Sequence, residues 1–429
     1  MRRVSRELLA AAVVTALLSV PVAMAAEGTT ATAASKTTST TRTKVPSKPS
    51  PTPTATPTAS PTPTATATPT ATATPTATAT ATATPTASPS PTSTPTASSF
   101  VTRNGTQLLL AGAPFRFTGV NIYNANSVNN CWYSLGTGSA LGDSLTALGG
   151  GARVFRAWFF QNEATVNGAR DWTAMDHTLA VARAAGFHVI PVLINQWGQC
   201  ETWSTYADGY KTESWYQGGY KTLPTSPGMA STYRDWVREV VSRYKNDPTV
   251  LAWQMVNEAE DKAAYGGACN STAASSLQSF AADIAGLIKS IDANHLVSIG
   301  TIGSGQCGSA GTAYKSLYAT AGVDLCEYHD YSTVAMPGDQ WNGLSTRISQ
   351  CASLGKPLFV GESGVKATDA GGTLTDRANL FGSKVTTQFN AGVVGELLWD
   401  WRDSAHGGSS TSGYEIGPGD PALSALAAG

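Results

Sequence analysis

The 429-residue chain contains few charged residues, 13% of the total, and no run of basic residues longer than Arg2-Arg3. Seven basic and two acidic residues lie before residue 100, so residues 100–429 carry 21 basic and 27 acidic groups. A mildly acidic surface without basic patches argues against nucleic acid or an anionic membrane as a partner. A neutral polymer is compatible with this charge.

Other absences narrow the function further. There is no C-x-x-C pair and no close Cys/His cluster, so we expect no structural zinc site and no metal. No glycine-rich phosphate loop follows a strand-like segment, so we expect neither nucleotide binding nor a cofactor. Beyond the first 25 residues no apolar run is long enough to span a bilayer, and we expect no membrane partner.

The first 25 residues have the pattern of a secretory signal peptide. A basic start is followed by an apolar run over residues 8–22 and by an A-x-A site at Ala23-Met24-Ala25. A membrane anchor is the weaker interpretation, because the run is short and contains Pro21. We therefore predict a secreted, extracellular protein.

Residues 26–99 are predicted to be a disordered linker. From residue 29 to 98 the chain is almost wholly Thr, Pro, Ala and Ser, with no aromatic residue and one branched aliphatic residue, Val45. Such a segment cannot bury enough apolar surface to offset its ordering entropy, and its prolines keep it extended. The sequence does not reveal what the linker tethers.

Residues 100–429 read as one α/β domain in which strand-like and helical segments alternate. Strands are expected at 117–122, 153–158, 188–194, 250–256, 296–300, 323–329, 358–361 and 393–399. Helices are expected at 142–148, 172–185, 229–245, 273–290, 313–319, 344–354 and 376–390. Eight repeats favour a closed (β/α)8 TIM barrel over an open sheet. An Asn104-Gly105 turn within residues 101–110 predicts a short β-hairpin before the barrel.

Two of the apolar strands end abruptly in a glutamate. One is W-Q-M-V-N-E, ending at Glu258, and the other is P-L-F-V-G-E, ending at Glu362. Barrel enzymes place their chemistry at the C-terminal ends of the strands. Two carboxylates at this face indicate a hydrolase of glycosidic bonds.

Polar and aromatic residues also recur at the other strand ends. They are Arg156, Trp158, Asn195, Trp197, Asn257, His329, Tyr331 and Trp399. Each alone has an ordinary structural explanation, such as an ion pair or a core contact. Their convergence on one face of the barrel makes them candidates for a site.

In these segments the chain resembles glycoside hydrolase family five, a family of retaining barrel glycosidases, and within it the endo-β-mannanases. The resemblance covers most of residues 100–401. Its clearest segments are V-F-R-A-W (154–158), D-P-T-V-L-A-W-Q-M-V-N-E (247–258), H-D-Y (329–331) and K-P-L-F-V-G-E (356–362).

The resemblance implies a role for each matching residue. Glu258 would be the general acid/base and Glu362 the nucleophile, with Arg156 and Tyr331 bonded to Glu362. The remaining implied roles are a contact of Asn257 with the sugar 2-hydroxyl, orientation of the site by His329 near Glu258, and an aromatic floor formed by Trp399.

Four other residues are expected to bind substrate, and the tryptophans among them have flat faces that stack on sugar rings. Trp158, Asn195 and Trp197 lie at strand ends, and Trp215 lies in the aromatic-rich segment 200–228, which we interpret as a wall of the cleft. Packing of this segment within its own loop is the alternative.

All six cysteines lie in the domain, and an even count in an exported protein favours disulfides. In a barrel, Cys269 and Cys307 would lie on adjacent loops, and Cys326 on a strand beside the helix of Cys351. That leaves Cys131 with Cys200. We expect these three pairs.

We therefore predict a secreted, monomeric, retaining endo-glycosidase that cuts β-1,4 links of a polysaccharide, with mannan as the leading substrate. A cellulase acting on β-glucan, or an exo-acting or transglycosylating enzyme, is the alternative on the same scaffold. A non-catalytic carbohydrate-binding wall protein is a third interpretation.

Overall fold

The computed structural model describes residues 99–127 and 131–428. The predicted signal peptide and all but the last residue of the predicted linker lie outside these residues.

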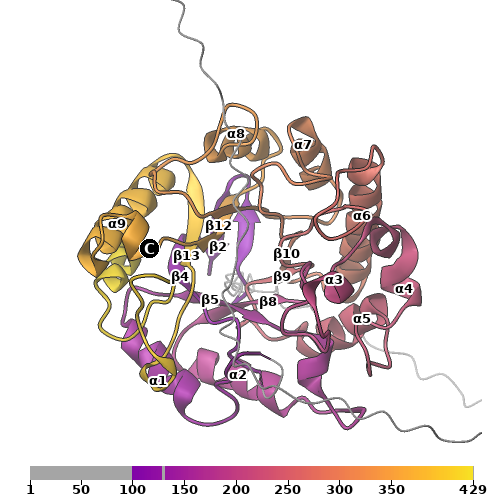
Figure 1. Ribbon diagram of the computed structural model, residues 1–429, viewed down its shortest axis with the longest axis horizontal. Coiled ribbons are helices and arrows are strands. Elements are labelled where there is room, and N and C mark those ends of the chain that lie inside the picture. Colours follow the sequence, from indigo (N-terminus) through magenta and orange to yellow (C-terminus); the bar gives the residue numbers. More distant parts are fainter. Residues whose placement is uncertain (1–98, 128–130, 429) are drawn as a thin grey trace, which may run out of the picture. The chain divides into compact units, whose positions relative to one another are not determined.

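Eight parallel strands form the barrel (Figure 1). They are β4 (Phe117–Asn121), β5 (Val154–Trp158), β8 (His188–Val192), β9 (Ala252–Gln254), β10 (Leu296–Ser298), β11 (Cys326–Asp330), β12 (Leu358–Ser363) and β13 (Val393–Leu398). The hydrogen-bonded order is β10-β9-β8-β5-β4-β13-β12-β11, and a parallel bridge between Ser298 and Leu325 joins its two ends. The predicted (β/α)8 barrel is confirmed.

All seven predicted helices are present around the strands (Figure 1). They are α1 (Ala140–Leu148), α2 (Thr173–Ala184), α5 (Tyr233–Tyr244), α6 (Ala273–Ile291), α7 (Thr312–Tyr318), α8 (Leu344–Ser353) and α9 (Leu374–Asn390). α9 begins earlier than expected because Thr373 and Asp376 form a capping box, each side chain accepting from the other's backbone N–H. Among the described residues, no helix has both the length and the apolar character needed to cross a bilayer.

Short elements occupy the connections and the C-terminal end. They are η1 (Gln161–Ala164), β6 (Thr165–Val166), β7 (Ala169–Arg170), α3 (Tyr206–Gly209), η2 (Trp215–Gly219), α4 (Tyr220–Thr222), η3 (Ala367–Asp369), η4 (Ser404–His406) and η5 (Pro421–Ala428). The pattern of the sequence predicted none of them, because each is too short to show a hydrophobic period.

The predicted N-terminal hairpin is part of a three-stranded antiparallel sheet. It comprises β1 (Thr102–Asn104) and β2 (Gln107–Leu110), and an unpredicted strand, β3 (Ala113–Phe115), pairs with β2. Val101 and Leu108 are buried in a core cluster with residues near the starts of barrel strands, including Phe117, Val154 and Leu296. The sheet therefore covers the N-terminal end of the barrel and leaves the opposite end for a site.

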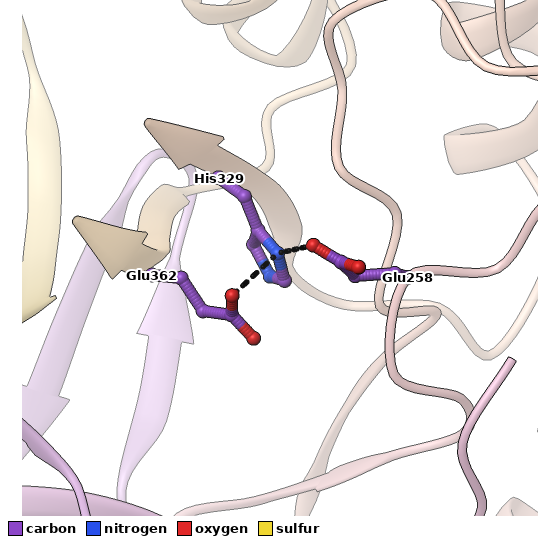
Figure 2. A group of neighbouring side chains, drawn as sticks. All are labelled: Glu258, His329 and Glu362. Atoms are coloured by element: carbon purple, nitrogen blue, oxygen red, sulfur yellow. Dashed lines mark hydrogen bonds and ion pairs between the residues drawn. The ribbon is translucent and has the colours of Figure 1, made fainter. Parts of the chain in front are cut away.

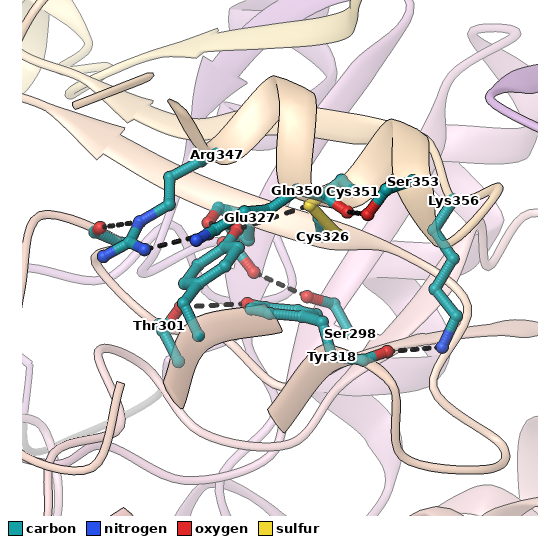
Figure 3. Close-up of a disulfide and its surroundings, with 12 residues drawn as sticks. Ser298, Thr301, Tyr318, Cys326, Glu327, Arg347, Gln350, Cys351, Ser353 and Lys356 are labelled. Carbon is teal, nitrogen blue, oxygen red and sulfur yellow. Dashed lines mark hydrogen bonds between the residues drawn. A yellow bond between two sulfur atoms is a disulfide. The ribbon is translucent and has the colours of Figure 1, made fainter. Parts of the chain in front are cut away.

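Three disulfides connect the described residues in the expected pairs: Cys131–Cys200, Cys269–Cys307 and Cys326–Cys351. Figure 3 shows the last of these, which joins β11 to α8. β11 also carries His329, so this cross-link ties one strand of the candidate site to the outer layer of helices.

Leu108→Ala should lower the free energy of unfolding by about 2–5 kcal/mol, because the side chain is 1% exposed and its loss leaves a cavity under the barrel. Guanidinium unfolding measures this change. Leu223→Ala is the matched control, since Leu223 is 56% exposed. Equal losses in the two variants would contradict the assigned packing of the N-terminal sheet.

Candidate active site

Side chains from four regions of the barrel meet at the C-terminal ends of its strands. Arg156 comes from β5, Glu258 follows β9, His329 comes from β11 and Glu362 from β12. Because all eight strands are parallel, these ends lie on one face. Residues as far apart in the chain as Arg156 and Glu362, separated by 206 positions, are hydrogen-bonded there.

Glu362 is held by a donor at each of its oxygens. Arg156 donates from Nη1 to Oε1 at 2.8 Å, and the hydroxyl of Tyr331 donates to Oε2 at 2.5 Å. His329 Nδ1 lies 3.4 Å from Oε2. The side chain is 3% exposed, so these contacts fix its position and direction.

Arg156 is fully buried and bonds to more than the carboxylate of Glu362. Its Nε donates to Gln254 Oε1 at 2.6 Å, and its Nη2 donates to Asn257 Oδ1 at 2.6 Å. Nη1 also donates to Asn121 Oδ1 at 3.0 Å. The planar guanidinium therefore aligns β4, β9 and β12 around β5.

Glu258 has an unusual backbone conformation. Its φ is +60°, a region that costs a non-glycine residue on the order of 1–3 kcal/mol. Hydrogen bonds on both sides hold it there: Asn257 N donates to Ile194 O at 2.7 Å, and Ala259 N donates to Gly300 O at 2.8 Å. The chain thus leaves the strand at Glu258.

The side chain of Glu258 faces two donors. Trp197 Nε1 donates to Oε2 at 2.6 Å, and His329 Nδ1 lies 2.9 Å from Oε1. Its side chain is 15% exposed against 3% for Glu362, so Glu258 is the more accessible carboxylate.

His329 lies between the two carboxylates (Figure 2). One oxygen of Glu258, one of Glu362 and a ring nitrogen of His329 all lie within 4.8 Å of one another. Retaining glycosidases need carboxyl groups about 5–5.5 Å apart, whereas inverting enzymes need a wider gap that admits water. The observed spacing fits retention.

The environment of His329 raises its pKa to about 10. Burial acts in the opposite direction, but the charge of Glu362 and the hydrogen bonds to Glu258 and Glu327 outweigh it. His329 is therefore an imidazolium at neutral pH, and both ring nitrogens donate.

The pKa values of the two carboxyl groups shift in opposite directions. Burial, reinforced by the charge of Glu258, raises the pKa of Glu362. Burial also acts on Glu258, yet the hydrogen bond and charge of His329 and the bond from Trp197 lower the pKa of Glu258. Transfer of the proton from Nδ1 to Oε1 across 2.9 Å would give neutral His329 and a carboxylic acid at Glu258. The pair can therefore hold one exchangeable proton beside the more accessible carboxylate.

Glu258, His329 and Glu362 are also the only group of three His, Cys, Asp or Glu residues in residues 99–127 and 131–428 close enough to ligate a metal. Their bonding suits proton transfer better. Each ring nitrogen of His329 lies within hydrogen-bonding distance of a glutamate oxygen, at 2.9 and 3.2 Å. Arg156 donates to Glu362 at 2.8 Å.

A family model described as Cellulase (glycosyl hydrolase family 5) matches residues 111–405, more than half of the chain. The chain belongs to this family. The resemblance to family five is thereby confirmed.

Relatives of this family 5 chain include mannan endo-1,4-beta-mannosidase A of Hypocrea jecorina, 27% identical over 352 residues that cover 73% of each chain. Mannan endo-1,4-beta-mannosidase 4 of Solanum lycopersicum is 26% identical over 301 residues, 61% of this chain and 73% of that protein. The structure of an endo-1,4-beta-mannanase from Rhizomucor miehei superposes with a TM-score of 0.57 at 20% identity, covering 77% of this chain and 97% of that one. At that identity the likeness shows the shared barrel fold.

The sequence did not assign Glu327 to the site. It lies two residues before His329 on β11, is fully buried, and accepts hydrogen bonds from His329 Nε2 at 3.2 Å and Gln254 Nε2 at 2.5 Å. Its other oxygen accepts from Ser298 Oγ at 2.7 Å (Figure 3). Because alternate residues of a strand share a face, the spacing from His329 was the available signal.

Aromatic rings cluster near the C-terminal end of β13. Trp399 is partly exposed and stacks on Tyr123 with ring centroids 5.4 Å apart. Trp158 lies 6.2 Å from Trp399, stacks on Phe160 and is 3% exposed. Trp399 is therefore the more accessible of the two tryptophan rings, and Trp158 packs against it from the interior.

The structure corrects three expected substrate contacts. The first is Trp158, which is 3% exposed and stacks on Phe160 in the interior. Asn195 is 1% exposed, and its Oδ1 accepts a hydrogen bond from Asn257 Nδ2 at 3.0 Å. Asn195 therefore positions the side chain of Asn257 from within the barrel. Trp215 is 8% exposed and packs 5.4 Å from the rings of Tyr233 and Phe280 on α5 and α6. It belongs to the core because the helices bury its faces.

Glu327→Gln should lower the pKa of His329 by about 1 unit, because it removes one charge-assisted acceptor while keeping the shape of the side chain. An NMR titration of the His329 ring measures the change, starting from a midpoint of about 10. Glu239→Gln, on the outer helix α5, should leave the midpoint unchanged. An unaltered midpoint in Glu327→Gln would contradict the role of Glu327.

Proposed function

We propose that this chain is a secreted, retaining endo-hydrolase that cleaves internal β-1,4 bonds of mannan. The observation that carries the proposal is the pair of carboxylates, Glu258 and Glu362, with oxygens within 4.8 Å in a family 5 barrel. The relatives named mannan endo-1,4-beta-mannosidases support mannan as the substrate.

In this mechanism the two glutamates act in sequence. Glu362 attacks the anomeric carbon while Glu258 gives a proton to the leaving oxygen. The proton is the one that Glu258 shares with His329 at 2.9 Å. Glu258 then takes a proton from water, which breaks the glycosyl ester of Glu362 and restores the site.

The neighbouring residues position the sugar and the nucleophile. Arg156 and Tyr331 keep Glu362 aimed through their bonds of 2.8 and 2.5 Å. Asn257 uses Oδ1 for Arg156 and one N–H for Asn195, which leaves a second N–H for the 2-hydroxyl of the sugar. Trp399 provides the aromatic floor beneath that sugar.

A β-glucan is the second candidate substrate. The matching family model carries the description Cellulase, and mannose differs from glucose only in the orientation of the 2-hydroxyl. Exo action and transglycosylation use the same carboxylates. A non-catalytic wall protein fits less well, because both carboxylates retain their donors.

Export and organisation belong to the same proposal. Residues 1–25 would direct secretion, and residues 26–99 would act as a spacer before the catalytic domain. Three disulfides support an oxidising compartment. We propose a monomer whose partner is the polysaccharide.

Products released from galactomannan, glucomannan and carboxymethylcellulose test the substrate directly. The expected result is a series of short oligosaccharides from the two mannans, appearing early as an endo pattern. Glu362→Ala is the matched inactive control and should retain binding. Products from carboxymethylcellulose alone would overturn the mannanase proposal, and mannose as the sole early product would overturn endo action.

The pH dependence of kcat/KM follows from Glu362. This nucleophile works only when ionised, and its pKa is raised above 4.5, so activity should be lost as pH falls through a value above 4.5. Initial rates on a mannan oligosaccharide between about pH 3 and about pH 7 measure it. An acid limb centred below 4.5 would contradict the raised pKa.

A further inference from the structure

Two exposed tyrosines form a stacked pair in the loops that follow β8 and β9. Tyr206, at the start of α3, is 40% exposed, and Tyr265, in the loop after β9, is 50% exposed. Their ring centroids lie 6.4 Å apart with an angle of 23° between the planes. We call Tyr206 and Tyr265 the outer aromatic pair.

The outer aromatic pair is connected to Glu258 through Trp197. Tyr265 meets Trp197 edge to face at 6.3 Å, and Tyr210 lies 5.7 Å from both rings. Trp197 Nε1 donates to Glu258 Oε2 at 2.6 Å. A continuous series of rings therefore runs outward from this carboxylate.

The loops that carry these rings are anchored. The loop of Tyr265 is fixed by the Cys269–Cys307 disulfide and by a hydrogen bond from Glu213 N to Lys262 O at 2.7 Å. The hydroxyl of Tyr206 accepts from Gln199 Nε2 at 2.5 Å. The exposed rings are thus held in place before any ligand binds.

The position of the outer aromatic pair in the barrel shows on which side of the cleft the pair lies. Trp197 follows β8 and Tyr265 follows β9, which are neighbours in the barrel. Glu362 lies on β12, between β11 and β13, and Trp399 follows β13. The outer aromatic pair therefore extends from the carboxylate that would protonate the leaving oxygen, on the side away from the nucleophile.

We propose that the outer aromatic pair continues the cleft beyond Trp197 and binds the leaving-group portion of the substrate, a β-1,4-linked hexose oligosaccharide. The apolar faces of pyranose rings stack on exposed aromatic rings, and two nearly parallel tyrosines offer such a surface beyond Trp197. This inference rests on the proposed function. In transglycosylation an acceptor sugar enters where the leaving group departs. The same aromatic surface would therefore also bind acceptor sugars.

The test compares Tyr206→Ala/Tyr265→Ala with Tyr206→Phe/Tyr265→Phe in the full chain. On mannopentaose the alanine variant should lose about tenfold in kcat/KM, and the phenylalanine variant should stay within about twofold of wild type. On p-nitrophenyl β-mannobioside, which has no sugar in the leaving group, all three proteins should be alike. The share of transfer products should fall in the alanine variant.

Equal losses on both substrates would overturn the inference, because the rings would then support Glu258 rather than bind sugar. An unchanged alanine variant on mannopentaose would overturn it as well. If folded wild type acts only on cellopentaose, mannan is the wrong substrate, and the same comparison with cello-oligosaccharides decides the inference separately. A folded wild type inactive on every one of these substrates would overturn the proposed function and the inference together.

Discussion

The site depends on the buried guanidinium of Arg156. It bonds directly to Glu362 and, through Gln254, to Glu327, which in turn accepts from His329 beside Glu258. One hydrogen-bonded series therefore joins the two candidate catalytic carboxylates beneath the place where a sugar would lie. Removing the guanidinium would leave several buried acceptors unpaired, a loss of about 3–5 kcal/mol for a broken buried ion pair.

His329 gives the two carboxylates different tasks. It lies 2.9 Å from Glu258 and 3.4 Å from Glu362, and its positive charge allows both to remain near each other in a buried site. Of these two carboxylates, Glu258 is the one that is hydrogen-bonded to His329. Glu362 is the one that accepts hydrogen bonds from Arg156 and Tyr331. A proton carrier and an oriented nucleophile need such unlike surroundings.

Long apolar runs with a clear period predicted the barrel and its seven main helices. The same runs located the residues at the strand ends. Arg156, Asn257, Glu258, His329, Tyr331 and Glu362 meet as the resemblance implied. The supporting residues were not predictable: Asn121, Gln254 and Glu327 are polar residues within buried strands, where sequence does not show which partner satisfies them. The error at Trp215 has a related cause, since a ring that faces sugar and a ring that packs between helices look alike in a sequence.

The most direct measurement of the central claim is covalent trapping. The full chain would be incubated with a 2-deoxy-2-fluoro-β-mannosyl fluoride, digested and analysed by peptide mass spectrometry. The account predicts a stable fluorosugar ester on Glu362 and on no other residue. A label on Glu258, or no label together with products of inverted anomeric configuration by NMR, would contradict it.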